Sequence, residues 1–344
     1  MKDRAKEVAL EQLVRVLDRV PLVSSVKNDL SGLRSLLYRR RPPRNAALGL
    51  AGSGRSTLLR SLIERRPARD SLQPEHGQWV QLEHEGAKVD WLEIDLNDRD
   101  ARAQWKHSLE KEMPDLVFLS FEPRNASDAK RIIERAKSLL PDVPEGIAAL
   151  RVFTLMTHAD LIGRGDADVE AARNELEAKI KDSGLSADPP RAVSAISGYG
   201  LEGLSEAMVL ALPVEARLEA ARALTRAKEA RIRIGNEIVQ ACTAVSVTVG
   251  VTPIPFSDMV LLGPLQAMMV SSLAYLSGRS MGRKTVAEWL GSIGVVGGIG
   301  MGLRFSAQTI AKLVPGAGNV VSAAVAGAGT TAIGQSAVKY FLKS

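Results

Sequence analysis

A glycine-rich run near residue 50 contains residue types whose spacing suits the binding of phosphate groups. Glycines let successive backbone N–H groups converge on phosphate oxygens, a helix that begins at the loop adds its positive N-terminus, and a Ser or Thr hydroxyl can ligate Mg²⁺. Ser56 is therefore a predicted metal ligand. The residues predicted to bind phosphate are Gly49, Gly52, Ser53, Gly54, Arg55, Ser56 and Thr57.

The loop departs from the Gly-x-x-x-x-Gly-Lys-Ser/Thr pattern at one position, where Arg55 replaces lysine. The wide planar guanidinium of arginine does not fit the slot that a compact ammonium fills between two phosphates. We therefore expect weaker phosphate binding than with lysine, and an even greater loss in the stabilisation of transition-state charge.

An acid ends the next long strand pattern, Val89–Asp95. In proteins with this kind of loop, a carboxylate at such a strand end holds Mg²⁺, so Asp95 is the second predicted metal ligand. The segment from Asp95 to Asp98 resembles the Asp-x-x-Gly motif of Ras- and Era-type GTPases, whose glycine N–H senses the terminal phosphate, but Asp98 replaces that glycine and would bring a carboxylate there. Unless that side chain turns away, its charge would repel the phosphate, which argues against sensing of a γ-phosphate.

Two later segments could bind a guanine base. The first places an aspartate after a buried strand, where its carboxylate can accept from the two neighbouring N–H donors of guanine that adenine lacks. A histidine beside it can lie flat along the base. The second segment looks like the Ser-Ala-x loop of GTPases, whose backbone N–H meets the guanine carbonyl. The predicted guanine-binding residues are Thr157, His158, Asp160, Ser194, Ala195 and Ile196.

In this order and at these spacings, the segments resemble the motifs of Era-like P-loop GTPases of the Ras superfamily. The run Gly198–Leu204 is similar to the start of their final helix. The resemblance implies a P-loop GTPase-like fold, GTP or GDP with Mg²⁺ as ligands and, if the site is active, hydrolysis of GTP to GDP and phosphate. Two departures argue against turnover. The switch region expected at 66–77 has no threonine, and Arg99 replaces a water-orienting glutamine.

Strand and helix patterns alternate over residues 45–212, which predicts an α/β domain with a mostly parallel sheet and helices on both faces. The connection Glu85–Ala87 is short enough for one antiparallel hairpin. The predicted strands are 45–50, 78–83, 88–95, 115–121, 150–156 and 191–195, and the predicted helices are 56–65, 100–111, 126–140, 167–182 and 201–211.

Three further regions flank this GTPase-like domain. Residues 1–44 carry apolar side chains at helical spacing on both sides of Pro21 and are predicted to form two amphipathic helices. Residues 213–234 are rich in alanine and charged residues, which favours a connecting helix. Residues 235–344 accumulate glycine, alanine, valine and serine and are predicted to form an all-α domain.

Parts of this last region have the length and neutrality of membrane helices. The runs 238–257 and 259–278 contain no charged residue, and a membrane helix needs roughly 20 residues. Prolines and Gln266 interrupt the runs, so buried helices and membrane spans both remain open. Stripes of small residues at Gly294–Gly302 and Ala323–Thr331 favour tightly packed helices in either case.

The run Val251–Asp258, followed by Gln266 and Met269, resembles the Pro-Ile-Pro…Asp…Gln-x-x-Met signature of the YcjF-like domain of unknown function. Such domains are frequently fused behind Era-like GTPase domains and are associated with membranes. The resemblance covers about residues 235–340 and implies a membrane partner.

Composition narrows the choice of partners. The 344 residues carry a net charge of +6 and 4% aromatic residues, so few rings could stack bases and no nucleic-acid partner is predicted. The basic balance favours anionic lipid. One cysteine and no secretory signal predict a cytoplasmic protein, peripheral or integral at the inner face of the cell membrane. Homo-oligomerisation remains open.

Two hypotheses follow from the sequence. The first is a membrane-associated GTP-binding protein whose nucleotide state is coupled to the glycine-rich helical domain, with slow or absent hydrolysis. The alternative is a pseudo-GTPase, a scaffold or membrane receptor without productive nucleotide binding.

Overall fold

The computed structural model describes residues 39–64, 77–84, 86–123, 126–140, 150–162, 165–251, 262–279 and 318–343. The helices predicted before residue 39, the switch region before residue 77, the signature Pro253–Asp258 and the stripe Gly294–Gly302 lie outside the described residues. Contacts divide the chain into two compact units. One spans residues 41–230, and the other contains the described helices after that point.

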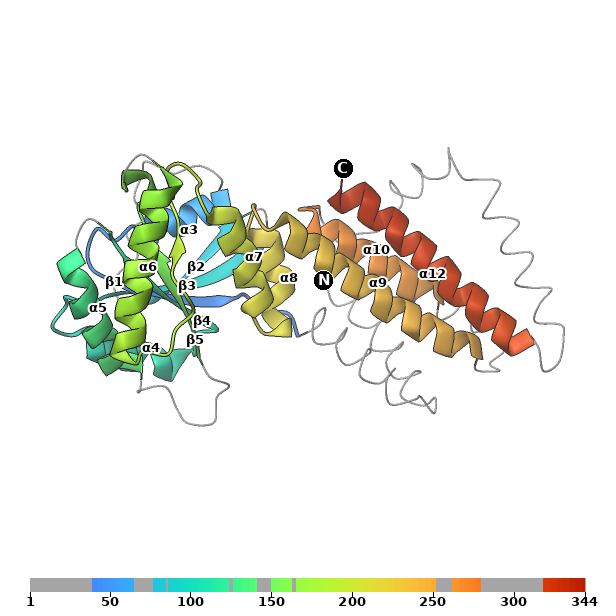
Figure 1. Ribbon diagram of the computed structural model, residues 1–344. Helices are drawn as coiled ribbons and strands as arrows, with labels where there is room; N and C mark the ends of the chain where they lie inside the picture. Colours follow the sequence, from blue (N-terminus) through green and yellow to red (C-terminus); the bar gives the residue numbers. More distant parts are fainter. Residues whose placement is uncertain are drawn as a thin grey trace. The chain divides into compact units, whose positions relative to one another are not determined.

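A six-stranded sheet forms the centre of the first unit, in the order β2-β3-β1-β4-β5-β6 (Figure 1). β2 is antiparallel to β3, and the other neighbouring strands are parallel. This topology confirms the predicted α/β fold with a mostly parallel sheet. The strands are β1 (Arg44–Gly49), β2 (Trp79–His84), β3 (Ala87–Asp95), β4 (Leu116–Phe121), β5 (Arg151–Met156) and β6 (Arg191–Ala192).

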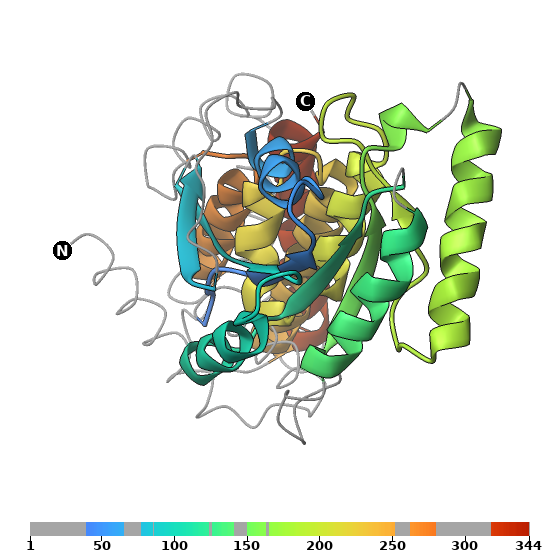
Figure 2. The same cartoon turned by 90° about the vertical axis from the view of Figure 1, so that its left-hand side faces the viewer.

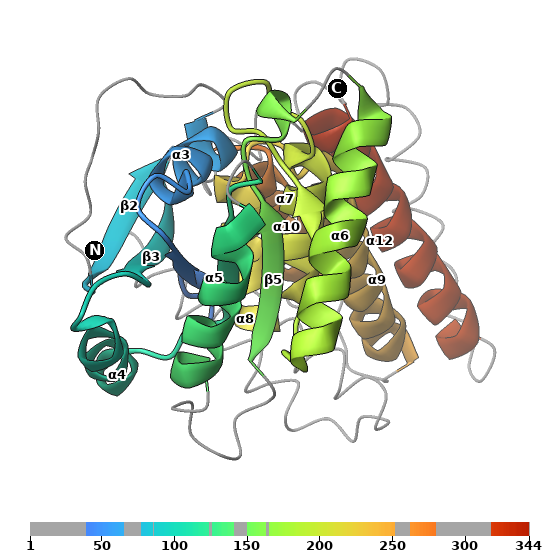
Figure 3. The same cartoon turned by 60° about the vertical axis from the view of Figure 1, so that its left-hand side comes forward.

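Helices cover both faces of this sheet. α5 and α6 lie side by side on the near side of β5, and α7 and α8 lie behind it (Figures 2 and 3). The helices of this unit are α3 (Arg55–Glu64), α4 (Ala101–Lys111), α5 (Ala126–Leu139), α6 (Asp166–Ser183), α7 (Leu201–Ala211) and α8 (Val214–Ala223). Because both faces are covered, most side chains of the central strands are buried and apolar.

Alternate residues of each strand build two different layers. Leu92, Ile94 and Leu119 belong to the core that packs against α4, α5 and α6. On the opposite face, the ring of Phe118 stacks at 5.7 Å from that of Trp91 and at 5.9 Å from that of Phe153. β1 lies between β3 and β4 and places the small Ala47 beside Phe118, which leaves room for rings from two non-adjacent strands to meet.

Two helices, rather than the single connecting helix predicted over 213–234, follow α7. α8 ends at Ala223 and packs against β3, so it belongs to the first unit. The chain then turns before α9 (Lys228–Val251) begins. The N–H and Oγ1 of Thr225 both donate to the Leu62 carbonyl, at 3.1 and 3.3 Å. These bonds hold the turn against the last residues of α3 and explain why the helix does not continue.

The second unit contains α9, α10 (Gly263–Leu276) and α12 (Gly318–Leu342) (Figure 1). The described part is all-α, as predicted. Glycines allow close approach between α9 and α12: a Cβ on Gly334 would lie 2.6 Å from both methyl groups of Val239, and one on Gly327 would lie 2.6 Å from a methyl group of Val247. Part of the predicted small-residue stripe therefore lies at a helix contact.

Hydroxyl groups join the same helices. Gln266 Nε2 donates to Thr330 Oγ1 at 3.0 Å, Thr330 Oγ1 donates to Ser246 Oγ at 2.8 Å, and Ser246 Oγ donates to the Cys242 carbonyl at 2.8 Å. Among the described helices, none combines the length and the apolar character needed to cross a membrane.

Candidate nucleotide site

The glycine-rich loop lies where the sequence placed it, between the end of β1 at Gly49 and the start of α3 at Arg55. Gly52 and Gly54 have φ values of 80° and 77°, a left-handed region that favours glycine. A Cβ on Gly49 would lie 2.6 Å from Ser53 Oγ. The backbone path of the loop therefore favours glycine at positions 52 and 54, while Gly49 leaves room for the Ser53 side chain, and α3 directs its N-terminus toward the loop.

Arg55 is held beneath this loop. Its side chain is 5% exposed, and Nη1 donates to the Gly49 carbonyl at 2.7 Å and also to the Ile94 carbonyl. Burial lowers the pKa of Arg55, while the charges of Glu93 and Asp95 oppose that shift. Arg55, which was predicted to bind phosphate, thus donates hydrogen bonds to backbone carbonyl groups near the ends of β1 and β3.

Glu93 is the residue that the sequence analysis missed. Its side chain is 2% exposed; Oε2 accepts from Ser56 Oγ at 2.9 Å and lies 4.0 Å from Arg55 Nε. The other carboxylate oxygen accepts from Trp91 Nε1 at 2.9 Å. A buried carboxylate needs such partners to offset its lost hydration. A signal was present in the sequence, because Glu93 interrupts an apolar strand two residues before Asp95.

The two predicted Mg²⁺ ligands lie near this network. Ser56 directs its hydroxyl hydrogen to Glu93, which leaves its oxygen lone pairs for a cation. Asp95 Oδ1 accepts from the Asn97 N–H at 2.9 Å. A cation bound by these two residues would need phosphate and water oxygens as its remaining ligands. Within the described ranges, no group of three or more His, Cys, Asp or Glu residues is arranged to hold a metal.

The carboxylate of Asp98 is held by two hydrogen-bond donors beside the start of α4. One carboxylate oxygen accepts from the Asp100 N–H at 2.9 Å, and the other accepts from Gln104 Nε2 at 2.8 Å. The carboxylate therefore caps the approach to α4.

The predicted base-binding segments converge on one cavity of about 100 Å³. The start of α3, the end of β5 and the end of β6 meet there, because the carboxyl ends of parallel strands lie at one edge of the sheet. Its lining residues are Gly54, Thr57, Leu58, Thr157, His158, Asp160, Val193, Ala195 and Ile196.

His158 and Thr157 shape the floor of this cavity. His158 has a left-handed backbone with φ 54°, and a Cβ on Gly54 would lie 3.1 Å from its Cε1 atom. The imidazole therefore packs against the phosphate loop. Thr157 is buried, and its Oγ1 donates to the Phe121 carbonyl at 3.1 Å. Thr157 thus positions the segment, while Asp160 is exposed and makes no hydrogen bond or ion pair with the described part of the chain.

The loop after β6 is fixed from several sides. Ser194 is buried, and its Oγ accepts from the Ser197 N–H at 3.1 Å. The Ala195 carbonyl accepts from Ser61 Oγ of α3 at 2.9 Å. A Cβ on Gly200 would lie 2.1 Å from the Ala192 carbonyl oxygen. Ile196 remains 68% exposed at the edge of the cavity.

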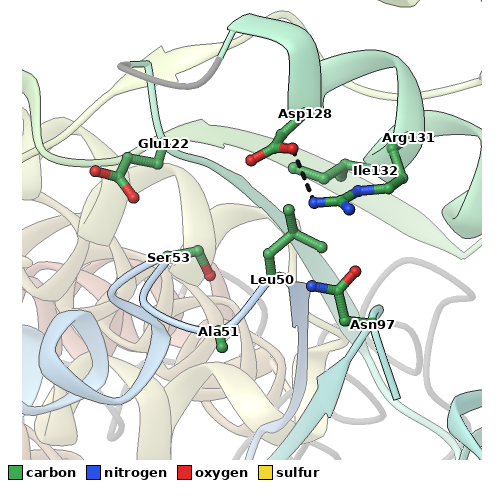
Figure 4. A pocket seen from close by; sticks show the side chains of 8 residues that line it. All are labelled: Leu50, Ala51, Ser53, Asn97, Glu122, Asp128, Arg131 and Ile132. Carbon is green, nitrogen blue, oxygen red and sulfur yellow. Dashed lines mark hydrogen bonds and ion pairs between the residues drawn. The ribbon is translucent and has the colours of Figure 1, made fainter. Parts of the chain in front are cut away.

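A second cavity, of about 120 Å³, lies beside Leu50, Ala51 and Ser53 of the loop (Figure 4). Arg131 donates to Asp128 at 2.8 Å, and Glu122 adds a further carboxylate. The sequence analysis did not identify this cavity. Its lining residues are Leu50, Ala51, Ser53, Asn97, Glu122, Asp128, Arg131 and Ile132.

No protein-family model matches the chain, and comparison with curated proteins gives no significant match.

Proposed function

We propose that the protein binds guanine nucleotides, hydrolyses them slowly or not at all, and associates with a membrane through its helical unit. The observation that carries the proposal is the cavity at the end of the parallel sheet. Three segments that are far apart in the sequence line the same space. They lie around Gly54, Asp160 and Ala195. Their chemistry supplies a phosphate loop, a carboxylate and backbone amides.

Guanine selectivity would come from Asp160. The carboxylate is exposed at the cavity and makes no competing contact with a described residue. It can accept two hydrogen bonds from guanine, whereas adenine lacks the matching pair of donors. The imidazole of His158, packed against Gly54, provides a flat surface beside the base.

The residues expected around the phosphates support slow hydrolysis. Stabilisation of a transferring phosphoryl group relies on cations and Mg²⁺ placed around it. Arg55 instead donates to backbone carbonyls, and Arg99 occupies the position of a water-orienting glutamine. Ser56 and Asp95 are the residues that would hold Mg²⁺, which would neutralise phosphate charge when bound.

Membrane association is supported by the neutrality of the helical unit. The described segments 238–251, 262–278 and 318–338 contain no charged residue. Arg279, Lys339 and Lys343 lie at the ends of α10 and α12. Neutral helices with cations at their ends suit a surface that carries anionic lipid headgroups.

The turn before α9 offers a route from the nucleotide to the helical unit. Thr225 is bonded twice to Leu62 near the end of α3, and α3 begins at the phosphate loop. Because α9 starts three residues after Thr225, a displacement of α3 on ligand binding would act on the base of α9. This arrangement supports coupling between ligand occupancy and the helices.

Calorimetric titration of the full chain with GDP, GTP and ATP in Mg²⁺ tests the proposal. We expect guanine-selective binding that Asp160→Ala weakens by more than about tenfold, the loss typical for hydrogen bonds to a charged group. Asp182→Ala removes an exposed aspartate from α6 and serves as the matched control. Equal affinity for ATP, or no effect of Asp160→Ala, would contradict the assignment of the base site.

The inward position of Arg55 also favours a second candidate, a pseudo-GTPase scaffold without productive nucleotide binding. A loop whose arginine is bonded to Gly49 and Ile94 has lost the cation that usually contacts phosphate. Absence of binding by any guanine nucleotide in the same titration would select this candidate.

A further inference from the structure

We infer that Glu206 of α7 is a positioning residue of the guanine site, because it ties the loop beside the base cavity to the first turn of α9. A bound guanine nucleotide and this turn then stabilise each other. The inference rests on the proposed nucleotide binding and adds a connection on the base side, whereas the route through Thr225 starts at the phosphate loop. Glu206 does not line the cavity and acts through the elements that it holds.

The start of α9 has no capping side chain of its own. α9 begins at Lys228 and is preceded by Ala227, which is buried. The first N–H groups of a helix have no acceptor within the helix, and alanine offers no side-chain oxygen to them. Glu206 supplies the acceptor from another helix: its carboxylate accepts from the N–H of Glu229, at 2.9 Å, and from the N–H of Ala230. The first turn of α9 therefore depends on α7.

The surroundings of Glu206 show that this cap compensates a cost. The residue is half-buried, and burial raises the pKa of its carboxyl group. The hydrogen bonds from the backbone of Ala230 and Glu229 oppose that shift, while the charges of Glu229 and Glu202 add to it. A carboxylate in this position is held by the N–H groups and the positive N-terminus of α9. Glu229 and Ala230 are also the last residues of the first unit, so the cap lies where α9 leaves that unit.

The other end of α7 is fixed to the loop beside the base cavity. α7 begins directly after Gly200, where a Cβ would lie 2.1 Å from the Ala192 carbonyl oxygen. Ala195 of the same loop lines the cavity. Glu206 follows Gly200 by less than about two helical turns. Because a helix is stiff over this length, the position of the loop sets the position of the carboxylate that caps α9.

A second contact joins this loop to the approach to α9. The guanidinium of Arg226 lies against Gly198, where a Cβ would be 3.3 Å from both Nη atoms. The Gly198 N–H donates to the Ser194 carbonyl at 3.0 Å, so Arg226 packs on the turn that shapes the loop. Arg226 directly precedes Ala227, the residue before α9. A ligand that orders the loop therefore favours both contacts, and by linkage the intact first turn of α9 favours the ligand.

Hydrogen exchange of the full chain, followed by NMR at the amides of Glu229 and Ala230, reads the cap directly, because neither amide has an acceptor within α9. We expect saturating GDP to slow their exchange by more than about fivefold in the wild-type protein. In Glu206→Ala, exchange should be fast with and without GDP. Binding of GDP that leaves both wild-type amides unchanged overturns the inference. Absence of GDP binding overturns the proposed function instead, so the two failures are distinct.

The affinity for GDP, measured by calorimetry, tests the reciprocal effect. Coupled sites change each other's affinity by the same factor, so Glu206→Ala should weaken GDP binding by more than about fivefold. Glu206→Gln, whose amide oxygen can still accept hydrogen bonds, should lie between the wild type and the alanine variant. Glu202→Ala removes an exposed acid from the same helix and should leave the affinity unchanged. An unchanged affinity in Glu206→Ala overturns the inference, and the wild-type exchange experiment decides it if that variant does not fold.

Discussion

Arg55 and Glu93 form a buried pair beneath the glycine-rich loop that follows β1, with Nε and Oε2 4.0 Å apart. Ser56 and Trp91 complete the coordination of the carboxylate, each at 2.9 Å. An arginine in this position would otherwise leave a charge in the apolar layer between α3 and the sheet. The arginine that replaces the loop lysine is therefore compensated by Glu93, the acid within β3.

Loss of either member of the pair should destabilise the first unit. Glu93→Leu leaves the Arg55 guanidinium buried without its carboxylate, and we expect the free energy of unfolding to fall by about 3 kcal/mol. Adding Arg55→Met should restore most of that loss, because an apolar pair needs no compensation. Urea unfolding of the two single variants and the double variant measures the coupling. Additive losses would show that the pair does not act as a unit.

Two glycines with similar backbone angles should respond differently to alanine. Gly200 has φ 70° and a Cβ there would lie 2.1 Å from the Ala192 carbonyl oxygen, whereas Gly52 has φ 80° and open space around its Cβ position. We expect Gly200→Ala to cost more than about 2 kcal/mol and to impair guanine binding. Gly52→Ala should cost about 1 kcal/mol, from backbone strain alone. Thermal unfolding compares them, and equal losses would contradict the packing at Gly200.

The contact between α9 and α12 can be tested with a second pair of glycines. A Cβ on Gly334 would lie 2.6 Å from both methyl groups of Val239, while one on Gly329 would meet nothing within 4 Å. Gly334→Ala should destabilise the helical unit by about 1–3 kcal/mol through overpacking. Gly329→Ala should be neutral or stabilising by up to about 1 kcal/mol, since alanine favours a helix. Circular dichroism during heating gives both values, and a harmless Gly334→Ala would refute this contact.

The thiol of Cys242 should be unreactive in the folded protein. Burial raises its pKa to about 12 from 9.0, so the thiolate is scarce at neutral pH. We expect no reaction with a thiol reagent at pH 8 until the protein is unfolded in urea. The folded state keeps the thiol proton up to a higher pH than the unfolded state does. The Cys242 thiol therefore lowers the free energy of unfolding as the pH rises from 9.0 toward about 12. Rapid labelling of the native protein would contradict the burial of α9 in its bundle.

Binding to vesicles should depend on anionic lipid. Flotation with vesicles that contain phosphatidylserine should recover the protein, and recovery should fall as salt screens the attraction. Replacing Lys339 and Lys343 by alanine should weaken binding by at least about fivefold, since each lysine near such a surface contributes about 1 kcal/mol. Lys88 and Lys111 of the first unit provide the matched double control. Equal recovery with neutral vesicles would argue against headgroup recognition.

The sequence by itself determined the α/β class and predicted most of the residues that line the cavity beside Gly54. Apolar runs that end at Gly49, Asp95 and Met156 predict parallel strands, and such strands bring their carboxyl ends to one edge whatever the details of packing. The residues after those ends therefore meet near one another. The local apolar pattern is enough to predict this meeting of strand ends, and an error of one or two residues in the predicted end of a strand does not change it.

The tertiary structure alone decided what the charged residues do. The sequence placed Arg55 among the phosphate ligands and did not connect it with Glu93, which lies on another element and faces it only because β1 and β3 pair in parallel. Likewise, the chain leaves the predicted connecting helix after α8 because Thr225 donates to the Leu62 carbonyl. The direction of the Asp98 carboxylate is set by the hydrogen bond from Gln104. The direction of a long polar side chain is set by partners distant in sequence, since burial penalises any charge or donor that lacks one.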